Sequence, residues 1–203
     1  MAALPALAGA LPTALMTLVA LGTVAASSAG AYRTGAPAAH TGGFGEPTCE
    51  TCHFSDGAAP GALTLHAPTE VAPGSAHNVR ITLRDPDLRS AGFQLSARFA
   101  DGPRRGQQAG SLTAPEESGL DVVVADGTEY IGHTGSSVRS VEPGEPVEWT
   151  LRWTAPTGGG AVVFHAAANA ANDDDSEFGD RIYTAAMRTR VKGDAPASPP
   201  PVR

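Results

Sequence analysis

The stretch Val147-Glu148-Trp149-Thr150-Leu151-Arg152-Trp153 alternates large apolar side chains with polar ones. A period of two puts the apolar set on one face of a β-strand and the polar set on the other. We therefore expect Val147, Trp149, Leu151 and Trp153 to be buried and the residues between them to meet water. The pattern predicts a half-buried strand of an antiparallel sheet.

Six further runs carry period-two alternation or β-branched and aromatic residues, with turn residues between them. These features favour strands, and no segment has a helical stripe of apolar residues. The runs are 78–83, 93–99, 122–124, 130–133, 161–166 and 182–191. About seven to nine short strands at this spacing predict an all-β fold, an immunoglobulin-like antiparallel β-sandwich.

The composition agrees with such a fold and excludes one class of function. The 203 residues include 24 glycines and 17 prolines, which suits short strands joined by many turns. The net charge of −7 is wrong for a protein that binds a nucleic-acid backbone, because that function needs a basic patch. It also disfavours attraction to an anionic membrane surface.

Residues 1–31 carry no charged side chain, and an apolar run at 14–24 leads into small residues. Two small-x-small sites, 24–26 and 29–31, fit signal-peptide cleavage. The segment predicts a secretory signal peptide and a periplasmic or extracellular protein. The alternative is an uncleaved membrane anchor, because the uncharged run is long enough to span a bilayer. Pro5, Pro12 and the many alanines would make it a poor membrane helix.

Both cysteines of the chain lie in Cys49-Glu50-Thr51-Cys52-His53, which is the C-x-x-C-H attachment sequence for c-type haem. Two thiols three positions apart can each form a thioether to one haem vinyl group. The adjacent His53 then supplies the axial nitrogen ligand to the iron. We expect one covalently bound haem c, with Cys49, Cys52 and His53 as its binding residues.

Three other interpretations of the two cysteines remain open. A Cys49–Cys52 disulfide is one, and a thioredoxin-like redox pair is another, although no βαβ context is visible around it. Half of a zinc site shared with another chain is the third, because a four-cysteine site is excluded by the cysteine count.

The sixth ligand of the iron is predicted by elimination. Met187 is the only methionine beyond the signal peptide. His133 is the favoured ligand, because it ends the run 130–133 and opens a turn at which a haem could lie. An open site, a water or a ligand from another subunit is also possible. The other candidates are His40 in the lead-in, His66, His77 and His165; the last alternates with Val163 and is expected to face the sandwich interior.

An acidic cluster follows the run 161–166, between Asn172 and Asp180. Oxygen donors at alternate positions can wrap a calcium ion, but the spacing does not match the twelve-residue EF-hand loop. We interpret the cluster as a solvated hairpin loop, with calcium binding by Asp173 to Asp180 as the alternative.

The order of these segments resembles the Reeler (reelin N-terminal-like) domain, an immunoglobulin-like β-sandwich of extracellular proteins. The resemblance rests on 92–98, 110–112, 133–134, 149–156 and 160–169. The chain is similar, more closely, to the bacterial choice-of-anchor V proteins, which begin with a Thr-Gly-Ala-Pro-like segment and a C-x-x-C-H. Here these are 34–37, or alternatively 41–44, and 49–53, with later matches at 168–172 and 179–184. The resemblance covers about 34–191 and implies the sandwich fold.

These observations divide the chain into a signal peptide (1–31), a lead-in and haem-attachment segment (32–60), a Reeler-like sandwich (61–192) and a proline-rich tail (193–203). The expected function is electron transfer by an exported monohaem c-type cytochrome that is not an enzyme. Its partner would be a redox protein with a basic docking patch, because the chain is acidic. No oligomeric state is indicated. The alternatives are a non-catalytic extracellular binding or adhesion module and a haem-based sensor or peroxidase with an open sixth site.

Overall fold

The computed structural model describes residues 34–55, 60–135, 141–174 and 176–193. The expected signal peptide and nearly all of the proline-rich tail lie outside these ranges. Within them are two 3₁₀ turns and ten strands. They are η1 (Gly43–Gly45), η2 (Cys49–Thr51), β1 (Ala62–His66), β2 (Glu70–Val71), β3 (Ala76–Arg84), β4 (Ser90–Phe99), β5 (Ser111–Thr113), β6 (Leu120–Ala125), β7 (Thr128–His133), β8 (Val147–Thr154), β9 (Gly160–Ala171) and β10 (Arg181–Val191).

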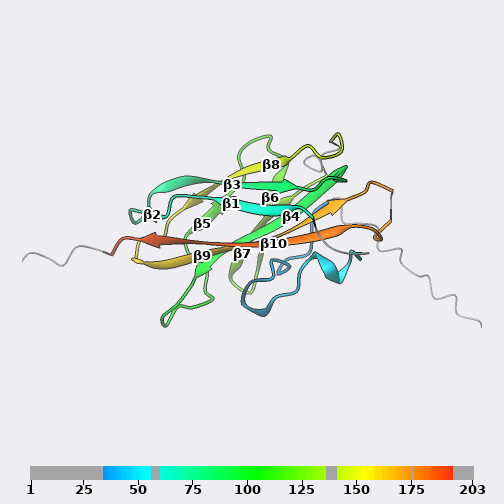
Figure 1. Ribbon diagram of the computed structural model, residues 1–203. Coiled ribbons are helices and arrows are strands. Elements are labelled where there is room, and N and C mark those ends of the chain that lie inside the picture. The colour runs from blue at the N-terminus through cyan, green and yellow to red at the C-terminus, as the bar shows by residue number, and fades with distance from the viewer. Residues whose placement is uncertain (1–33, 56–59, 136–140, 175, 194–203) are drawn as a thin grey trace, which may run out of the picture.

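The strands form two sheets packed face to face, and the fold is an all-β sandwich (Figure 1). One sheet has the order β1-β3-β8-β5 and the other the order β2-β10-β9-β4-β7-β6. Every neighbouring pair is antiparallel except β2 and β10, which are parallel. This exception to the expected antiparallel arrangement arises in the connection from β1 to β3, where two residues of β2 pair with the last two of β10.

The alternation in 147–153 is confirmed along β8. Val147, Trp149, Leu151 and Trp153 are buried, and the residues between them are exposed. The Trp153 ring meets Phe164 of the facing sheet edge-on at 5.0 Å, and its Nε1 donates to the Ala109 carbonyl at 2.9 Å. These contacts join the two sheets through one apolar core.

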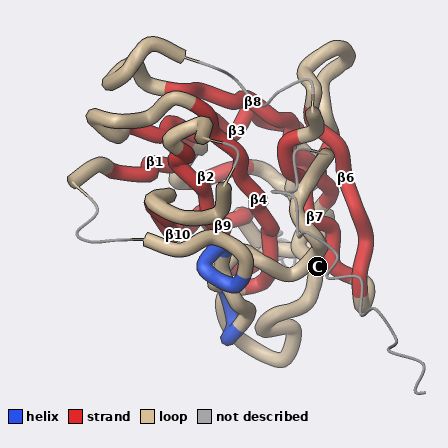
Figure 2. The backbone as a smooth tube through the Cα atoms, turned by 90° about the vertical axis from the view of Figure 1, so that its right-hand side faces the viewer, coloured by secondary structure: helices blue, strands red, loops and turns tan. Residues whose placement is uncertain are grey.

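Strands β4 and β9 are buried on both faces, which the sequence pattern did not predict. The outward-facing Gln94, Ser96 and Arg98 of β4 are polar and yet at most 6% exposed. The cause is residues 34–55, which lie across the outer face of the six-stranded sheet (Figures 1 and 2). We call these residues the N-terminal strap.

Polar contacts hold the strap on β4. The Gln94 amide donates to the Pro37 carbonyl at 2.8 Å and accepts from the His40 backbone N–H at 2.8 Å. Arg98 forms a largely buried ion pair with Glu46, which also accepts from the Tyr130 hydroxyl at 2.5 Å. The strap is therefore docked through buried hydrogen bonds and an ion pair.

The seven runs expected from the sequence all contain strands, each of them longer than expected. Strands β1, β2 and β5 were missed; β2 and β5 have two and three residues, too short for alternation to show. The sandwich strands run from Ala62 to Val191, inside the interval 61–192.

Candidate functional site

The C-x-x-C-H motif folds as a tight 3₁₀ turn on the strap. The Thr48 hydroxyl caps the turn by accepting from the Glu50 N–H at 3.2 Å. The Cys49 carbonyl accepts from the N–H groups of Cys52 and His53, at 3.1 and 3.0 Å. Both cysteines are free thiols and partly buried, and one short turn presents them together with the imidazole.

The environment of Cys49 is unlike that of a reactive thiol. Burial, opposed by a backbone hydrogen bond and reinforced by the nearby Cys52, raises the Cys49 pKa to about 12. Catalytic C-x-x-C pairs need a lowered pKa so that a thiolate forms near neutral pH. A thioredoxin-like pair lies between a strand and a helix. Here the turn lies instead on a strap across the face of a sheet.

His53 is held by two side chains from the β9–β10 hairpin. Its Nδ1 lies 2.6 Å from Oδ2 of Asp180 and 2.9 Å from Nδ2 of Asn169. Asn169 Nδ2 also donates to Asp180 Oδ2 at 2.8 Å. Asp180 is 1% exposed, so the contact with the imidazole is screened little by water.

The residue after His53 joins the motif to the same hairpin. The Phe54 N–H donates to the Glu177 carbonyl at 2.7 Å, and Phe54 forms a parallel bridge with Phe178. Their rings stack at 5.4 Å, although Phe54 is 46% exposed and Phe178 is 56% exposed. An exposed apolar pair therefore lies directly beside the motif.

His133 lies at the end of β7, and its imidazole covers Gly92 of β4. A Cβ at position 92 would come within 2.5 Å of that ring, so only glycine fits there. Gly92 is paired in register with Asn169, the residue that contacts His53. Both histidines are thus at the same end of the outer sheet face. The residue beneath His133, Gly92, is the strand partner of the residue that contacts His53, Asn169.

The bonding of His133 decides which nitrogen it can offer. Its Nδ1 lies 3.0 Å from the Phe93 N–H and 3.2 Å from the Phe93 carbonyl oxygen. The first contact suits a proton on Nε2 and the second a proton on Nδ1. Only the second tautomer leaves the Nε2 lone pair for a metal.

The other candidate ligands lie elsewhere. His66 and His77 are on β1 and β3 of the four-stranded sheet. Met187 pairs with Phe164, a residue of the apolar core. His40 lies on the strap, with its Nδ1 3.0 Å from the Ala38 carbonyl. Of these four, His40 alone shares the outer sheet face with His53.

The expectation that His165 faces the sandwich interior is wrong. It lies on the outer face of β9, under the strap, where the Phe44 ring meets it edge-on at 5.2 Å. The side chain of His165 points away from the sandwich interior. It is nevertheless partly buried, because the strap covers this outer face, and so burial does not distinguish the two faces of β9. A position four residues along the strand from Asn169 is about 13 Å away. His165 therefore lies about 13 Å along β9 from the residue that contacts His53.

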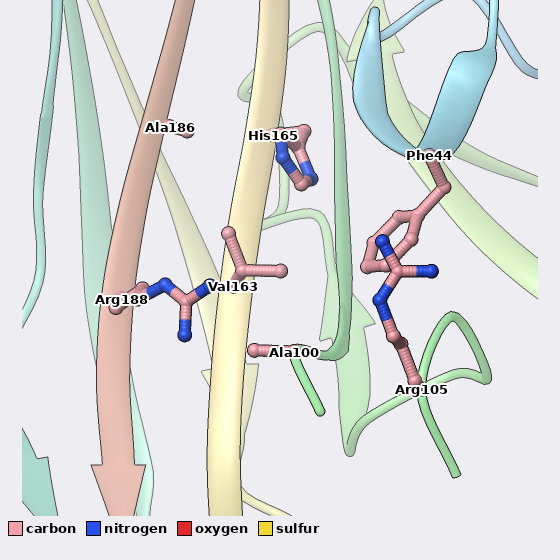
Figure 3. Close-up of a pocket in the computed structure, with 7 residues that line it drawn as sticks. All are labelled: Phe44, Ala100, Arg105, Val163, His165, Ala186 and Arg188. Atoms are coloured by element: carbon pink, nitrogen blue, oxygen red, sulfur yellow. The ribbon is translucent and has the colours of Figure 1, made fainter. Parts of the chain in front are cut away.

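His165 lines a pocket of about 370 Å³ between the strap and the sheet (Figure 3). The Phe44 ring closes one side of the pocket, and the side chains of Arg105 and Arg188 also line it. Desolvation, together with Arg98 and Arg188, lowers the pKa of His165 and keeps it neutral near pH 7. The pocket is separate from the cysteine motif.

The acidic cluster does not act as a unit in the structure. Asp173 and Asp174 are exposed, whereas Asp180 is buried and contacts His53; Asp175 lies outside the described residues. Asp174 accepts from the Asn172 amide and the Ser176 N–H, as in a local turn. In the portion of the chain that the structure describes, no three His, Cys, Asp or Glu side chains gather around a bare metal-ion site.

The sequence motif singles out Cys49, Cys52 and His53 as candidates but gives no sign of Asp180 and Asn169 beside them. In the sequence, Asp180 is one more member of an acidic loop. One feature of the sequence could have pointed to this pair: Asn169 is an amide residue within a run of alanines that follows an expected strand. A polar residue in so apolar a stretch needs a partner, and that partner is Asp180.

The similarity of the chain to known proteins is low. No protein-family model matches the chain, and no curated protein matches it. Among solved structures, the human F-spondin Reeler domain is similar at 15% identity and a TM-score of 0.43, over 69% of this chain and 91% of that one. A cohesin module from a Clostridium perfringens family 33 glycoside hydrolase is similar at 13% identity and a TM-score of 0.44, over 68% and 100%.

The structure shows no helix, within the ranges it describes, that is long and apolar enough to span a membrane. The predicted signal peptide at 1–31 is not among those residues.

Proposed function

We propose that the protein is an exported c-type cytochrome that transfers electrons through one haem bound covalently at Cys49 and Cys52, with His53 as axial ligand. The observation that carries this proposal is the state of His53. Its Nδ1 is engaged by a buried carboxylate, which leaves Nε2 as the nitrogen for a metal. Metal-ligating histidines are typically oriented in this way by a second hydrogen bond.

The residues around the motif fit a covalent haem. Two thiols and an imidazole come from one turn, and the exposed Phe54–Phe178 pair offers an apolar surface beside them. The raised pKa of Cys49 suits a thiol that is modified during maturation better than one that cycles as a redox pair. When bound, the haem would supply a one-electron couple between ferric and ferrous iron.

We further propose His133 as the sixth ligand, because it lies at the same end of the outer sheet face as His53. It would bind through Nε2, with the Nδ1 proton donated to the Phe93 carbonyl. His40 is the second choice on the same face. An open sixth position would instead favour a haem-based sensor or peroxidase.

The place of action belongs to the same proposal. The signal peptide expected at 1–31 and the resemblance to choice-of-anchor V proteins support a periplasmic or extracellular cytochrome. The net charge of −7 favours a redox partner with a basic docking patch.

A second candidate is an extracellular binding module, with the cysteines as a local disulfide. The observation in its favour is the exposed Phe54–Phe178 stack, since exposed aromatic groups often mark interaction surfaces. In that case the two phenylalanines, rather than the thiols, would be the functional residues.

Spectroscopy of protein produced in a host with c-type haem maturation machinery separates these functions. We expect a haem spectrum that survives acid–acetone extraction. It should be lost in the Cys49→Ser/Cys52→Ser double variant. In His133→Ala, the spin state should change while haem content is retained; Asp173→Ala serves as a surface control. Haem that is extracted freely would contradict covalent attachment, and an unchanged spin state would remove His133 as ligand.

A further inference from the structure

The contact between His53 and the hairpin specifies the position of a proton. An ionised carboxylate oxygen can only accept hydrogen bonds, so the proton in the 2.6 Å contact belongs to His53 Nδ1. The same rule orients Asn169: its amide nitrogen donates to Asp180, and its Oδ1 is left buried without a partner. The 2.9 Å contact between Asn169 Nδ2 and His53 Nδ1 then joins two donors that share Asp180 Oδ2 as acceptor, and it is not itself a hydrogen bond. An uncompensated buried oxygen is costly, so Asn169 is held in this orientation at the expense of stability.

Asp180 is also a buried carboxylate that has no lysine or arginine partner among the contacts that the structure shows. Its partners are His53, the Asn169 amide and, at 3.3 Å, the Asn172 N–H. The comparable buried carboxylate, Asp85, instead contacts the guanidinium of Arg181. His53 is the only basic side chain in contact with Asp180 among the residues that the structure describes. A buried negative charge without a full cationic partner is stabilised by positive charge placed nearby.

From these contacts we infer that Asp180, steadied by Asn169, is a positioning residue that fixes His53 in its Nδ1–H tautomer and lowers the reduction potential of the iron bound at Nε2. The inference rests on the proposed haem attachment. Hydrogen bonding from Nδ1 to a carboxylate increases the electron donation of the other nitrogen. The buried negative charge also favours the ferric state, which has one more positive charge than the ferrous state.

The fold gives this contact little freedom. Phe54, next to His53, is bonded to Glu177 of the hairpin, and Asp180 directly precedes β10. The imidazole and the carboxylate are therefore both tied to the loop between β9 and β10. The proposed cytochrome is thus one of low potential, suited to a donor or acceptor that works in that range.

The first test uses the protein without haem. Long-range ¹H–¹⁵N NMR of the histidine rings reports which nitrogen carries the proton. Near neutral pH the wild-type protein should show His53 protonated at Nδ1 when the ring is neutral, and Asp180→Asn should shift the population toward the Nε2–H form. A wild-type ring in the Nε2–H form would overturn the inference, whatever the haem content.

The second test measures the reduction potential of the haem-loaded protein. Asp180→Asn keeps an acceptor but removes the charge, and we expect the ferrous-to-ferric ratio at a fixed mediator potential to rise at least tenfold, equivalent to about 59 mV. Glu177→Gln is the matched control, because it removes one charge from the same loop, and no contact of its side chain with His53 is among those the structure shows. Asp180→Glu should restore part of the low potential.

Three outcomes decide the matter. A tenfold rise in Asp180→Asn against a smaller change in Glu177→Gln supports the inference. Equal changes in the two variants overturn it, because the effect would then be one of general charge. If Asp180→Asn does not fold, Asn169→Ala replaces it in the same measurement. The ferrous-to-ferric ratio of Asn169→Ala should also rise, and an unchanged ratio would count against the inference. Absence of haem from the wild-type protein would instead contradict the proposed function.

Discussion

Both faces of the six-stranded sheet are buried along β4 and β9, but by different physical means. The inner face packs apolar side chains against the four-stranded sheet, and the outer face is covered by the N-terminal strap through hydrogen bonds and the Arg98–Glu46 ion pair. Apolar burial is additive and tolerant, whereas a buried ion pair depends on both partners. The sandwich should therefore stand without the strap, while the cysteine motif depends on a few polar residues of β4, β9 and the loop between β9 and β10.

The largest effect should come from breaking the inner face. Trp153→Ala removes a fully buried ring between the sheets and should lower the free energy of unfolding by about 3–5 kcal/mol. Thr150→Ala, on the exposed face of the same strand, should change it by about 0.5 kcal/mol or less. Urea denaturation followed by tryptophan fluorescence measures both, and similar effects would contradict the assignment of the faces.

Removing one partner of the ion pair should break the outer face alone. Arg98→Met leaves Glu46 buried without a cation and should destabilise the docked strap by about 3–5 kcal/mol. Hydrogen exchange should then accelerate in 40–54 and stay slow in β8. The double variant Arg98→Met/Glu46→Gln should recover much of the loss. Faster exchange throughout the sandwich would show that strap and sandwich are one cooperative unit.

A smaller effect should follow from crowding the strap against β9. A Cβ at Gly43 would lie 2.6 Å from the His165 ring, so Gly43→Ala should cost about 1–3 kcal/mol of strap docking. His165→Ala in the same chain should relieve most of that cost by removing the ring. Exchange rates of 40–54 measure both variants. Failure of the second substitution to help would mean that the strap does not lie on His165 as described.

The smallest effect should come from a change in pH, which alters the stability of the sandwich rather than the docking of the strap. Burial raises the pKa of Asp85, but hydrogen bonds from Arg181, Tyr183 and the Asp87 N–H outweigh it and hold the pKa below the usual 3.8. A lowered folded-state pKa stabilises the protein above the unfolded value, and this stabilisation is lost as pH falls below about 3.8 toward the folded value.

The acid part of the stability profile should accordingly be less steep in Asp85→Asn than in the wild type. Asp87→Asn, at an exposed position that also contacts Arg181, should change the profile less. Unfolding free energies measured between neutral pH and strong acid would show this. An unchanged slope in Asp85→Asn would contradict the lowered pKa.

The sequence predicted most of the inner face and little of the outer one. Alternation in 147–153 placed every buried residue of β8 correctly, because one face of that strand meets water. It failed on β4 and β9, where the strap buries Gln94 and Arg98 as well as the core residues. Long-range polar contacts such as Arg98 with Glu46 leave no periodic trace in a sequence.

The candidate site divides in the same way. Cys49, Cys52 and His53 were found because their spacing within five residues is itself the signal. Asp180 lies 127 positions from His53, and only the fold brings the two together. The sequence also placed His133 at a strand end, but its position over Gly92 depends on the pairing of β4 and β7.

The most direct test of covalent haem attachment is the intact mass of the protein purified from a host with c-type haem maturation machinery. We predict a chain cleaved between about Ala26 and Ala31 that is heavier by one haem. A chain without haem and lighter by two hydrogens would make Cys49–Cys52 a disulfide. That result would contradict the cytochrome and leave the exposed Phe54–Phe178 pair as the place to look for function.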